Sequence, residues 1–92
     1  SIAVDYAPHI RCVAVCPGTI DTPMLRDAIA LSPDPDAVMQ ECIDMHLSKR
    51  IGTAEEVAEL VIFLCDDKAS FITGQAIRID GGLGITIQGS KK

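Results

Sequence analysis

Hydrophobic and polar positions along the chain predict two strands. Residues 10–16 form a nearly continuous apolar run that ends at a Pro-Gly pair. Such a run is typical of a strand that is covered on both faces, as in a parallel sheet. Residues 75–80 alternate apolar and polar side chains and end at Gly81 and Gly82, which predicts a second strand followed by a tight turn.

Residues 53–66 predict a capped helix. Thr53 and Glu56 have the spacing of a capping box, in which each side chain accepts a hydrogen bond from the other residue's backbone amide. Apolar side chains then recur at the spacing of one helical face, at Val57, Leu60, Val61 and Leu64. Other apolar residues lie off this face, so we expect the helix to be buried on more than one side.

Helical segments are also expected in the rest of the chain. Residues 1–9 read as the end of a helix that Pro8 terminates. Residues 24–31 predict a short helix with Thr22 as N-cap, and a second helix starts at Pro35 with Asp34 as its cap. Residues 83–92 are weakly patterned, and we expect the last of them to be disordered.

The order strand, helices, strand predicts two parallel strands joined by a crossover. Two parallel strands do not make an α/β sheet alone, because such sheets are built from several units and covered on both faces. The chain also begins with Ser1 rather than Met. We therefore expect it to be the end of a larger α/β domain.

Composition excludes several classes of protein. Of 92 residues, 48% are hydrophobic and 23% are charged, which is typical of a globular chain rather than a disordered one. The net charge of −5, the absence of a basic stripe and the presence of only three aromatic residues argue against nucleic-acid or membrane binding. We expect a cytoplasmic protein without a membrane span or signal peptide.

The four cysteines are best interpreted as free thiols. No Cys-x-x-Cys pair is present, so the spacing that is typical of a zinc site is lacking. Cys12 and Cys16 would share one face of the first strand, where we interpret them as core residues. No metal site is expected.

Four blocks in the chain together resemble the short-chain dehydrogenase/reductase family. They are Pro17-Gly18-Thr19-Ile20-Asp21-Thr22, Arg50-Ile51-Gly52-Thr53-Ala54-Glu55-Glu56-Val57-Ala58, Phe71-Ile72-Thr73-Gly74 and Asp80-Gly81-Gly82. Their order and spacing are those of the family, and they span nearly the whole chain. The resemblance implies the C-terminal third of a Rossmann-like, doubly wound parallel sheet. Val13 departs from the family, which usually has Asn or Ser there.

The resemblance also implies a cofactor site. Residues 17–23 would form a loop that binds the nicotinamide of NAD or NADP, with Pro17 shaping the turn and Gly18 letting a flat ligand approach. The backbone of Ile20 and the hydroxyl of Thr22 would hold the carboxamide, since together they offer a donor and an acceptor. The alternative is an ordinary strand-to-helix turn with Thr22 as a helix cap.

Residues 24–50 occupy the position of the family's substrate flap. Met24, Leu25, Ile29 and Met39 would form an apolar lid over the reacting atoms, or would only pack the flap onto the body. His46 is interpreted as a surface or flap histidine rather than an acid/base group. The run from Leu60 to Cys65 fits a contact between subunits of a homotetramer or dimer as well as it fits a buried core helix.

The family's catalytic pair is missing from the chain. Tyr6 is the only tyrosine and Ile10, not a lysine, stands four residues later. We expect the whole protein to transfer hydride between NAD(P) and a carbonyl or secondary alcohol, and this chain alone to be inactive. The alternatives are a truncated, non-catalytic relative that acts as an interaction module, and a compact helical binding domain without the two strands.

Overall fold

The computed structural model describes residues 1–88, except for the side chains of residues 87 and 88. The disorder expected for the last residues concerns 89–92, which lie outside the described residues. The elements follow in the order α1 (Ile2–Tyr6), β1 (Val13–Pro17), β2 (Ile20–Asp21), α2 (Pro23–Ala30), α3 (Pro35–Met45), β3 (Gly52–Thr53), α4 (Ala54–Cys65), a 3₁₀ turn (Asp67–Ala69), β4 (Gln75–Ile79) and α5 (Leu83–Gln88).

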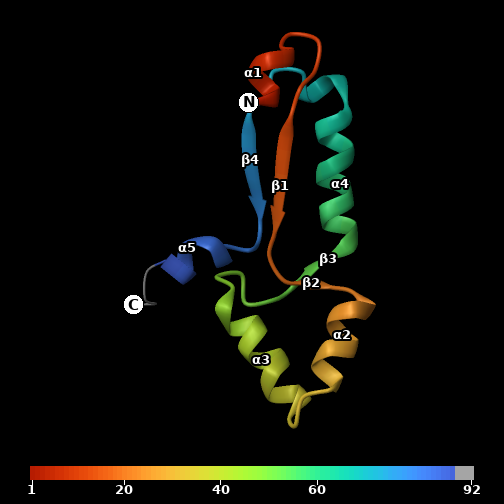
Figure 1. The fold of residues 1–92 in the computed structure, drawn as a ribbon. Coiled ribbons are helices and arrows are strands. Elements are labelled where there is room, and N and C mark those ends of the chain that lie inside the picture. Colours follow the sequence, from red (N-terminus) through yellow and green to blue (C-terminus); the bar gives the residue numbers. More distant parts are fainter. Residues whose placement is uncertain (89–92) are drawn as a thin grey trace.

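Strands β1 and β4 lie side by side and run parallel, as the crossover predicts (Figure 1). Their register pairs Val13 with Gln75 and Pro17 with Ile79. The first strand therefore begins at residue 13 rather than at residue 10. The backbone of Cys12 is already engaged before the ladder starts, because its N–H donates to the Thr73 hydroxyl and its carbonyl accepts from Gly74. Both predicted strands exist, which excludes the alternative of a purely helical domain.

Helix α4 packs along one face of β1 and begins at the predicted capping box (Figure 1). The Thr53 hydroxyl accepts from the Glu56 amide at 3.1 Å, and the Glu56 carboxylate accepts from the Thr53 amide at 2.9 Å. The Arg50 guanidinium donates to both carboxylate oxygens of Glu56, at 2.9 and 2.8 Å. Three local partners thus hold the first turn of the longest helix among the described residues.

Acid should weaken this first turn, because hydrogen bonds from Arg50 and from the Thr53 amide lower the pKa of Glu56 to about 2 from its ordinary 4.5. A lowered pKa in the folded state adds stability above the unfolded-state value, and that stability is lost as the pH falls toward 2. We expect Glu56→Gln, in the protein that contains this chain, to lower the free energy of unfolding at neutral pH. Denaturant titrations should show the difference from the unmodified protein shrinking below pH 4.5. A pH-independent difference would contradict this origin.

The expectation of a strand covered on both faces is wrong for the described residues. Val13 and Val15 are half-buried toward α4, whereas Ala14 and Cys16 on the opposite face are exposed. Cys12 is half-buried, so neither strand cysteine is a core residue here. The reason is that no described element lies over that second face.

Short elements at the carboxyl ends of the two strands complete the fold (Figure 1). Helices α2 and α3 start at Pro23 and Pro35 with Thr22 and Asp34 as N-caps, as the sequence predicts. Four elements were not predicted: strands β2 and β3, which pair in parallel over two residues, the 3₁₀ turn and helix α5.

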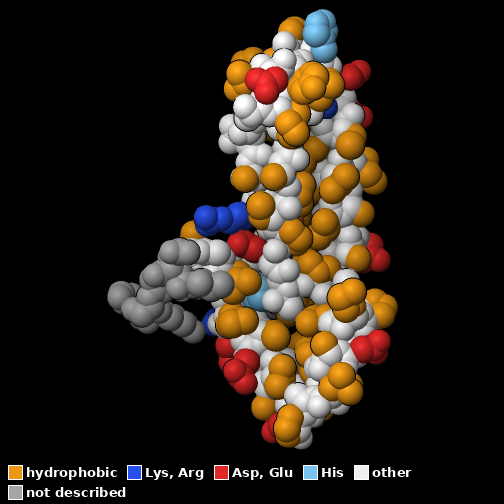
Figure 2. Space-filling view, viewed as in Figure 1, with side chains coloured by type: hydrophobic (Ala, Val, Ile, Leu, Met, Phe, Trp, Pro, Cys, Tyr) orange, Lys and Arg blue, Asp and Glu red, His pale blue; other side chains and the backbone are white. Residues whose placement is uncertain are grey.

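Few apolar side chains are buried within the described residues. Ile29, Leu64 and Ala69 form the buried apolar set, and large apolar side chains are exposed over much of the surface that Figure 2 shows. The Cα radius of gyration is 16.3 Å. A compact domain of this length would have a radius of about 12 Å. The chain thus has an extended shape with little core of its own, as expected for part of a larger domain.

Candidate functional site

The loop that follows β1 lies where both parallel strands end (Figure 1). Pro17 is the last residue of β1, Gly18 and Thr19 turn the chain, and Thr22 caps α2. Ligands of open α/β sheets bind outside the carboxyl ends of the strands. The predicted loop over residues 17–23 therefore has the position that a ligand site in this fold requires.

Gly18 is needed for a close backbone contact that the sequence did not indicate. A Cβ at this position would lie 2.9 Å from Asp80 Cα and 2.9 Å from Asp80 Cβ, closer than side chains pack. The Gly18 amide also donates to the Ile79 carbonyl at 3.2 Å. Because Gly18 has no side chain, the loop can close against the end of β4. This contact fixes the position of the loop residues that follow Gly18.

Thr22 combines a structural contact with a free donor. Its Oγ1 accepts a hydrogen bond from the Leu25 amide at 3.2 Å, which satisfies the N-cap role. Among the described residues no acceptor is paired with its O–H, so the hydroxyl can still donate to a ligand. The two interpretations of Thr22 are therefore compatible.

An ion pair between Arg26 and Asp21 holds the residue that precedes Thr22. Arg26, one turn into α2, donates from Nε and Nη2 to the two oxygens of Asp21 at 2.7 and 2.9 Å. The hydrogen bond from Arg26 lowers the pKa of Asp21. Ile20, the other expected carboxamide contact, is half-buried in β2 and pairs with Gly52.

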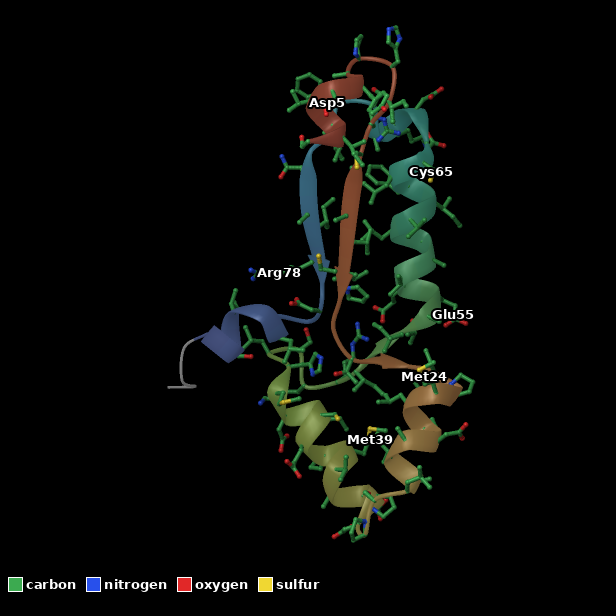
Figure 3. All side chains as sticks on the ribbon, viewed as in Figure 1. Asp5, Met24, Met39, Glu55, Cys65 and Arg78 are labelled. Atoms are coloured by element: carbon green, nitrogen blue, oxygen red, sulfur yellow. The ribbon has the colours of Figure 1, made fainter. Side chains whose placement is uncertain are left out.

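The four expected lid residues lie in different environments. Ile29 is buried, and Leu25 and Met39 are half-buried, with Met39 on the side of α3 that faces α2 (Figure 3). Met24 is 82% exposed at the start of α2, beside the loop after β1. The burial of Ile29 indicates a packing role, whereas the exposed side chain of Met24 is free to contact a ligand.

His46 is not a surface residue, as one of the two expected interpretations had it. It is 2% exposed, at the end of α3, where it lies against the loop after β1. Its Nε2 is 3.2 Å from the Thr19 amide nitrogen. The sequence carries no signal for this burial, since a single histidine in an irregular apolar pattern can face either way.

A cavity of about 320 Å³ opens beside His46. The loop after β1, the segment before β3 and the turn after β4 line it, with Thr19, Arg50, Arg78 and Gly82 among the lining residues. Because Thr19 and Ile20 are among its lining residues, the cavity adjoins the expected cofactor loop.

The turn after β4 is built around Asp80, as expected for a tight turn. Its carboxylate accepts from the amides of Gly84 at 2.8 Å and Gly82 at 3.0 Å, and these hydrogen bonds, that from Gly84 foremost, lower its pKa. Gly81 and Gly82 have φ values of 56° and 88°, a region that favours glycine. Residues 1–88 contain no cluster of three or more His, Cys, Asp or Glu placed to hold a metal ion.

The one tyrosine of the chain lies far from this site. Tyr6 ends α1, which lies at the opposite end of β1 from the loop (Figure 1). The described residues thus bring a loop and a helix cap to the ends of the two strands, followed by helices α2 and α3. None of their helices has the length and apolar character needed to cross a membrane.

Comparison with known proteins identifies the family. A family model described as enoyl-(acyl carrier protein) reductase matches residues 1–84. A dehydrogenase/reductase SDR family member 6 from Aquarana catesbeiana is 45% identical over 83 residues, which are 89% of this chain and 34% of the relative. A 2-keto-3-deoxy-L-fuconate dehydrogenase from Xanthomonas campestris is 46% identical over 84 residues, covering 89% and 28%.

Solved structures agree with the sequence matches. The ligand-free aldohexose dehydrogenase of Thermoplasma acidophilum superposes with a TM-score of 0.85 and 46% identity, over 99% of this chain and 38% of that one. A short-chain dehydrogenase family protein from Francisella tularensis gives 0.83 and 39%. The chain spans about a third of the length of these proteins, whose common fold is α/β and Rossmann-like. On this evidence the chain belongs to the short-chain dehydrogenase/reductase family of oxidoreductases.

Proposed function

We propose that this chain is the part of an NAD(P)-dependent oxidoreductase that holds the nicotinamide and covers the substrate. The observation that carries the proposal is the hydroxyl of Thr22, in the loop after β1. Its oxygen is fixed because it caps α2, and its O–H remains free to donate to a ligand. The nicotinamide cofactor, when bound, supplies or receives the hydride. The Tyr and Lys that would exchange the proton are not among these 92 residues.

The loop fits the chemistry of a carboxamide. A primary amide has one strong acceptor and an NH₂ donor, so its site needs a donor and an acceptor close together. The Thr22 hydroxyl supplies the donor, and a backbone carbonyl of the adjacent Ile20 segment is a suitable acceptor. Pro17 and Gly18 shape the turn that brings this segment to the strand ends. This fit supports cofactor binding by Pro17, Gly18, Ile20 and Thr22.

Helices α2 and α3 have the position of a substrate flap. They are joined to the cofactor loop through Thr22 and project beyond the strand ends (Figure 1). Apolar side chains at the start of α2 would exclude water from a reacting carbonyl or secondary alcohol. We infer that Met24, Leu25, Ile29 and Met39 form this flap, with Met24 nearest to the substrate.

A matched pair of exposed residues tests the flap. Met24 and Leu31 are 82% and 88% exposed, at opposite ends of α2. In the whole enzyme we expect Met24→Ser to raise the substrate KM by about fivefold, as for loss of one apolar contact, with the cofactor KM unchanged. Leu31→Ser should change neither constant. A larger effect of Met24→Ser on the cofactor KM than on the substrate KM would contradict this assignment.

The proposed activity is tested with the whole protein and reduced nicotinamide cofactors. NADH or NADPH should bind, and the absorbance of the reduced nicotinamide should fall when a carbonyl substrate is added. With the oxidised dinucleotide as hydride acceptor, the same absorbance should rise when a sugar or another secondary alcohol is oxidised. The names of the relatives suggest a panel of an aldohexose, a 2-keto-3-deoxy sugar acid and an enoyl-(acyl carrier protein). Binding of neither dinucleotide would contradict the proposal, and reduction of the enoyl substrate alone would replace the carbonyl assignment.

One observation favours an interaction role in addition. Val61, Ile62 and Phe63 on α4 are 42%, 69% and 44% exposed, which leaves an apolar face on this helix. We propose that this face meets either the remainder of the domain or a second subunit of a dimer or tetramer. A non-catalytic interaction module would use the same face, and it would bind no dinucleotide.

A further inference from the structure

His46 lies at the meeting point of three segments. It is the C-cap residue that follows α3, and it is the one polar side chain that is buried among the described residues. The loop after β1 contacts it through Thr19. The turn after β4 closes over it, because a Cβ on Gly81 would lie 3.6 Å from His46 Cδ2.

Both nitrogens of the imidazole have backbone partners. Nδ1 lies 2.6 Å from the Cys42 carbonyl oxygen, and Nε2 lies 3.2 Å from the Thr19 amide nitrogen. A carbonyl only accepts, so Nδ1 must carry the hydrogen. An amide N–H only donates, so Nε2 must keep its lone pair. The contacts thus require the neutral imidazole with its proton on Nδ1.

This imidazole completes a set of bonds that hold the cofactor loop. The Thr19 carbonyl accepts from the Gly52 amide at 2.9 Å, and the Gly18 amide donates to Ile79 at 3.2 Å. Those partners are backbone groups of the body. Of these three hydrogen bonds, the one to His46 is made by a side chain, and that side chain comes from the flap, as does Arg26, which binds Asp21 further along the loop. The peptide before Ile20 is therefore held from both the body and the flap.

We propose that His46 is a positioning residue that joins the substrate flap to the cofactor loop by accepting the Thr19 amide at Nε2. The inference rests on the proposed function, since it gives the loop a ligand to hold. His46 does not touch the ligand. It sets the direction of the peptide that leads to Ile20 and Thr22, so the flap and the nicotinamide contacts move together.

Two variants of similar size separate this role from simple filling of space. In His46→Gln the side-chain amide reaches the position of Nε2, so its oxygen can accept from Thr19. In His46→Asn the amide nitrogen takes the position of Nδ1, so the bond to Cys42 is kept and the bond to Thr19 is lost. Each variant thus keeps one of the two hydrogen bonds.

The readout is the affinity of the whole protein for NADH or NADPH relative to ADP-ribose, which lacks the nicotinamide. His46→Asn should weaken dinucleotide binding by about five- to tenfold, the effect of one lost hydrogen bond, and leave ADP-ribose unchanged. His46→Gln should bind both within about twofold of the unmodified protein, because its acceptor is retained. Equal losses in the two variants, or none in either, would overturn the proposal.

A spectroscopic measurement on the unmodified protein keeps the test independent of variant folding. With ¹⁵N-labelled histidine, His46 should show a pyrrole-type Nδ1 and a pyridine-type Nε2, assigned by the signals that His46→Gln removes. A hydrogen on Nε2 would overturn the inference even if dinucleotides bind. Failure of the unmodified protein to bind any dinucleotide, with the expected tautomer present, would instead contradict the proposed function and, with it, the role given to this contact.

Discussion

The 92-residue chain by itself is expected to lack a cooperative fold. Ile29, Leu64 and Ala69 are the apolar side chains that it buries among the described residues, while Ile62 and Phe71 are 69% and 101% exposed. Fixing each residue costs about 1–2 kcal/mol of conformational entropy, and so small a core does not offset that cost. Circular dichroism should show no cooperative thermal transition, and amide proton shifts should have little dispersion.

The whole protein under the same conditions is the control, and it should unfold cooperatively. Within the isolated chain, α4 has the best local signals, yet a helix of 12 residues is marginal without packing. A cooperative transition of the 92-residue chain, as a monomer or an oligomer, would contradict this expectation. It would favour the interaction module over a segment of an enzyme.

A second large effect is expected for Gly18→Ala in the whole protein. The added Cβ would lie 2.9 Å from Asp80 Cα, a backbone atom that cannot move without displacing the end of β4. We expect the free energy of unfolding to fall by about 1–3 kcal/mol, as for an overpacked site. Denaturant titration measures this loss, and dinucleotide affinity should fall with it because the loop shifts.

Gly52→Ala is the matched control for this substitution. Its Cβ would also meet an atom at 2.9 Å, but that atom is Cδ1 of Ile20, the end of a flexible side chain. Rotation of Ile20 relieves the contact, so the loss of stability should stay below about 1 kcal/mol. Equal losses in the two variants would show that the close contact with Asp80 does not control this loop.

Elements with local signals could be predicted from the sequence. The capping box of Thr53 and Glu56 gave the start of α4, because both partners lie within one turn. Thr22 with Pro23, and Asp34 with Pro35, gave the starts of α2 and α3 in the same way. The parallel pairing of β1 with β4 followed from the length of the crossover.

Features that depend on distant contacts could not be predicted. The β2–β3 pair has two residues in each strand and is held by a partner about thirty positions away. The burial of His46 depends on the turn after β4. The turn at Gly81 and Gly82 was predicted, but helix α5 was not, because the residues that follow the turn are weakly patterned.

The central claim is that the loop after β1 holds the nicotinamide through Thr22. The most direct test compares the whole protein with its Thr22→Val variant. For each of them, the dissociation constants of the reduced dinucleotide and of ADP-ribose are measured. Thr22→Ser keeps the hydroxyl, and Asp34→Ala removes the N-cap of α3, beyond the far end of α2 from Thr22, so the two variants control for the loss of a helix cap.

For Thr22→Val we predict dinucleotide binding weaker by about 5- to 30-fold, equivalent to roughly 1–2 kcal/mol for a lost hydrogen bond. ADP-ribose binding should not change, and Thr22→Ser and Asp34→Ala should bind both ligands like the unmodified protein. An equal loss for both ligands, or no loss for either, would contradict the role of Thr22 and with it the assignment of this loop.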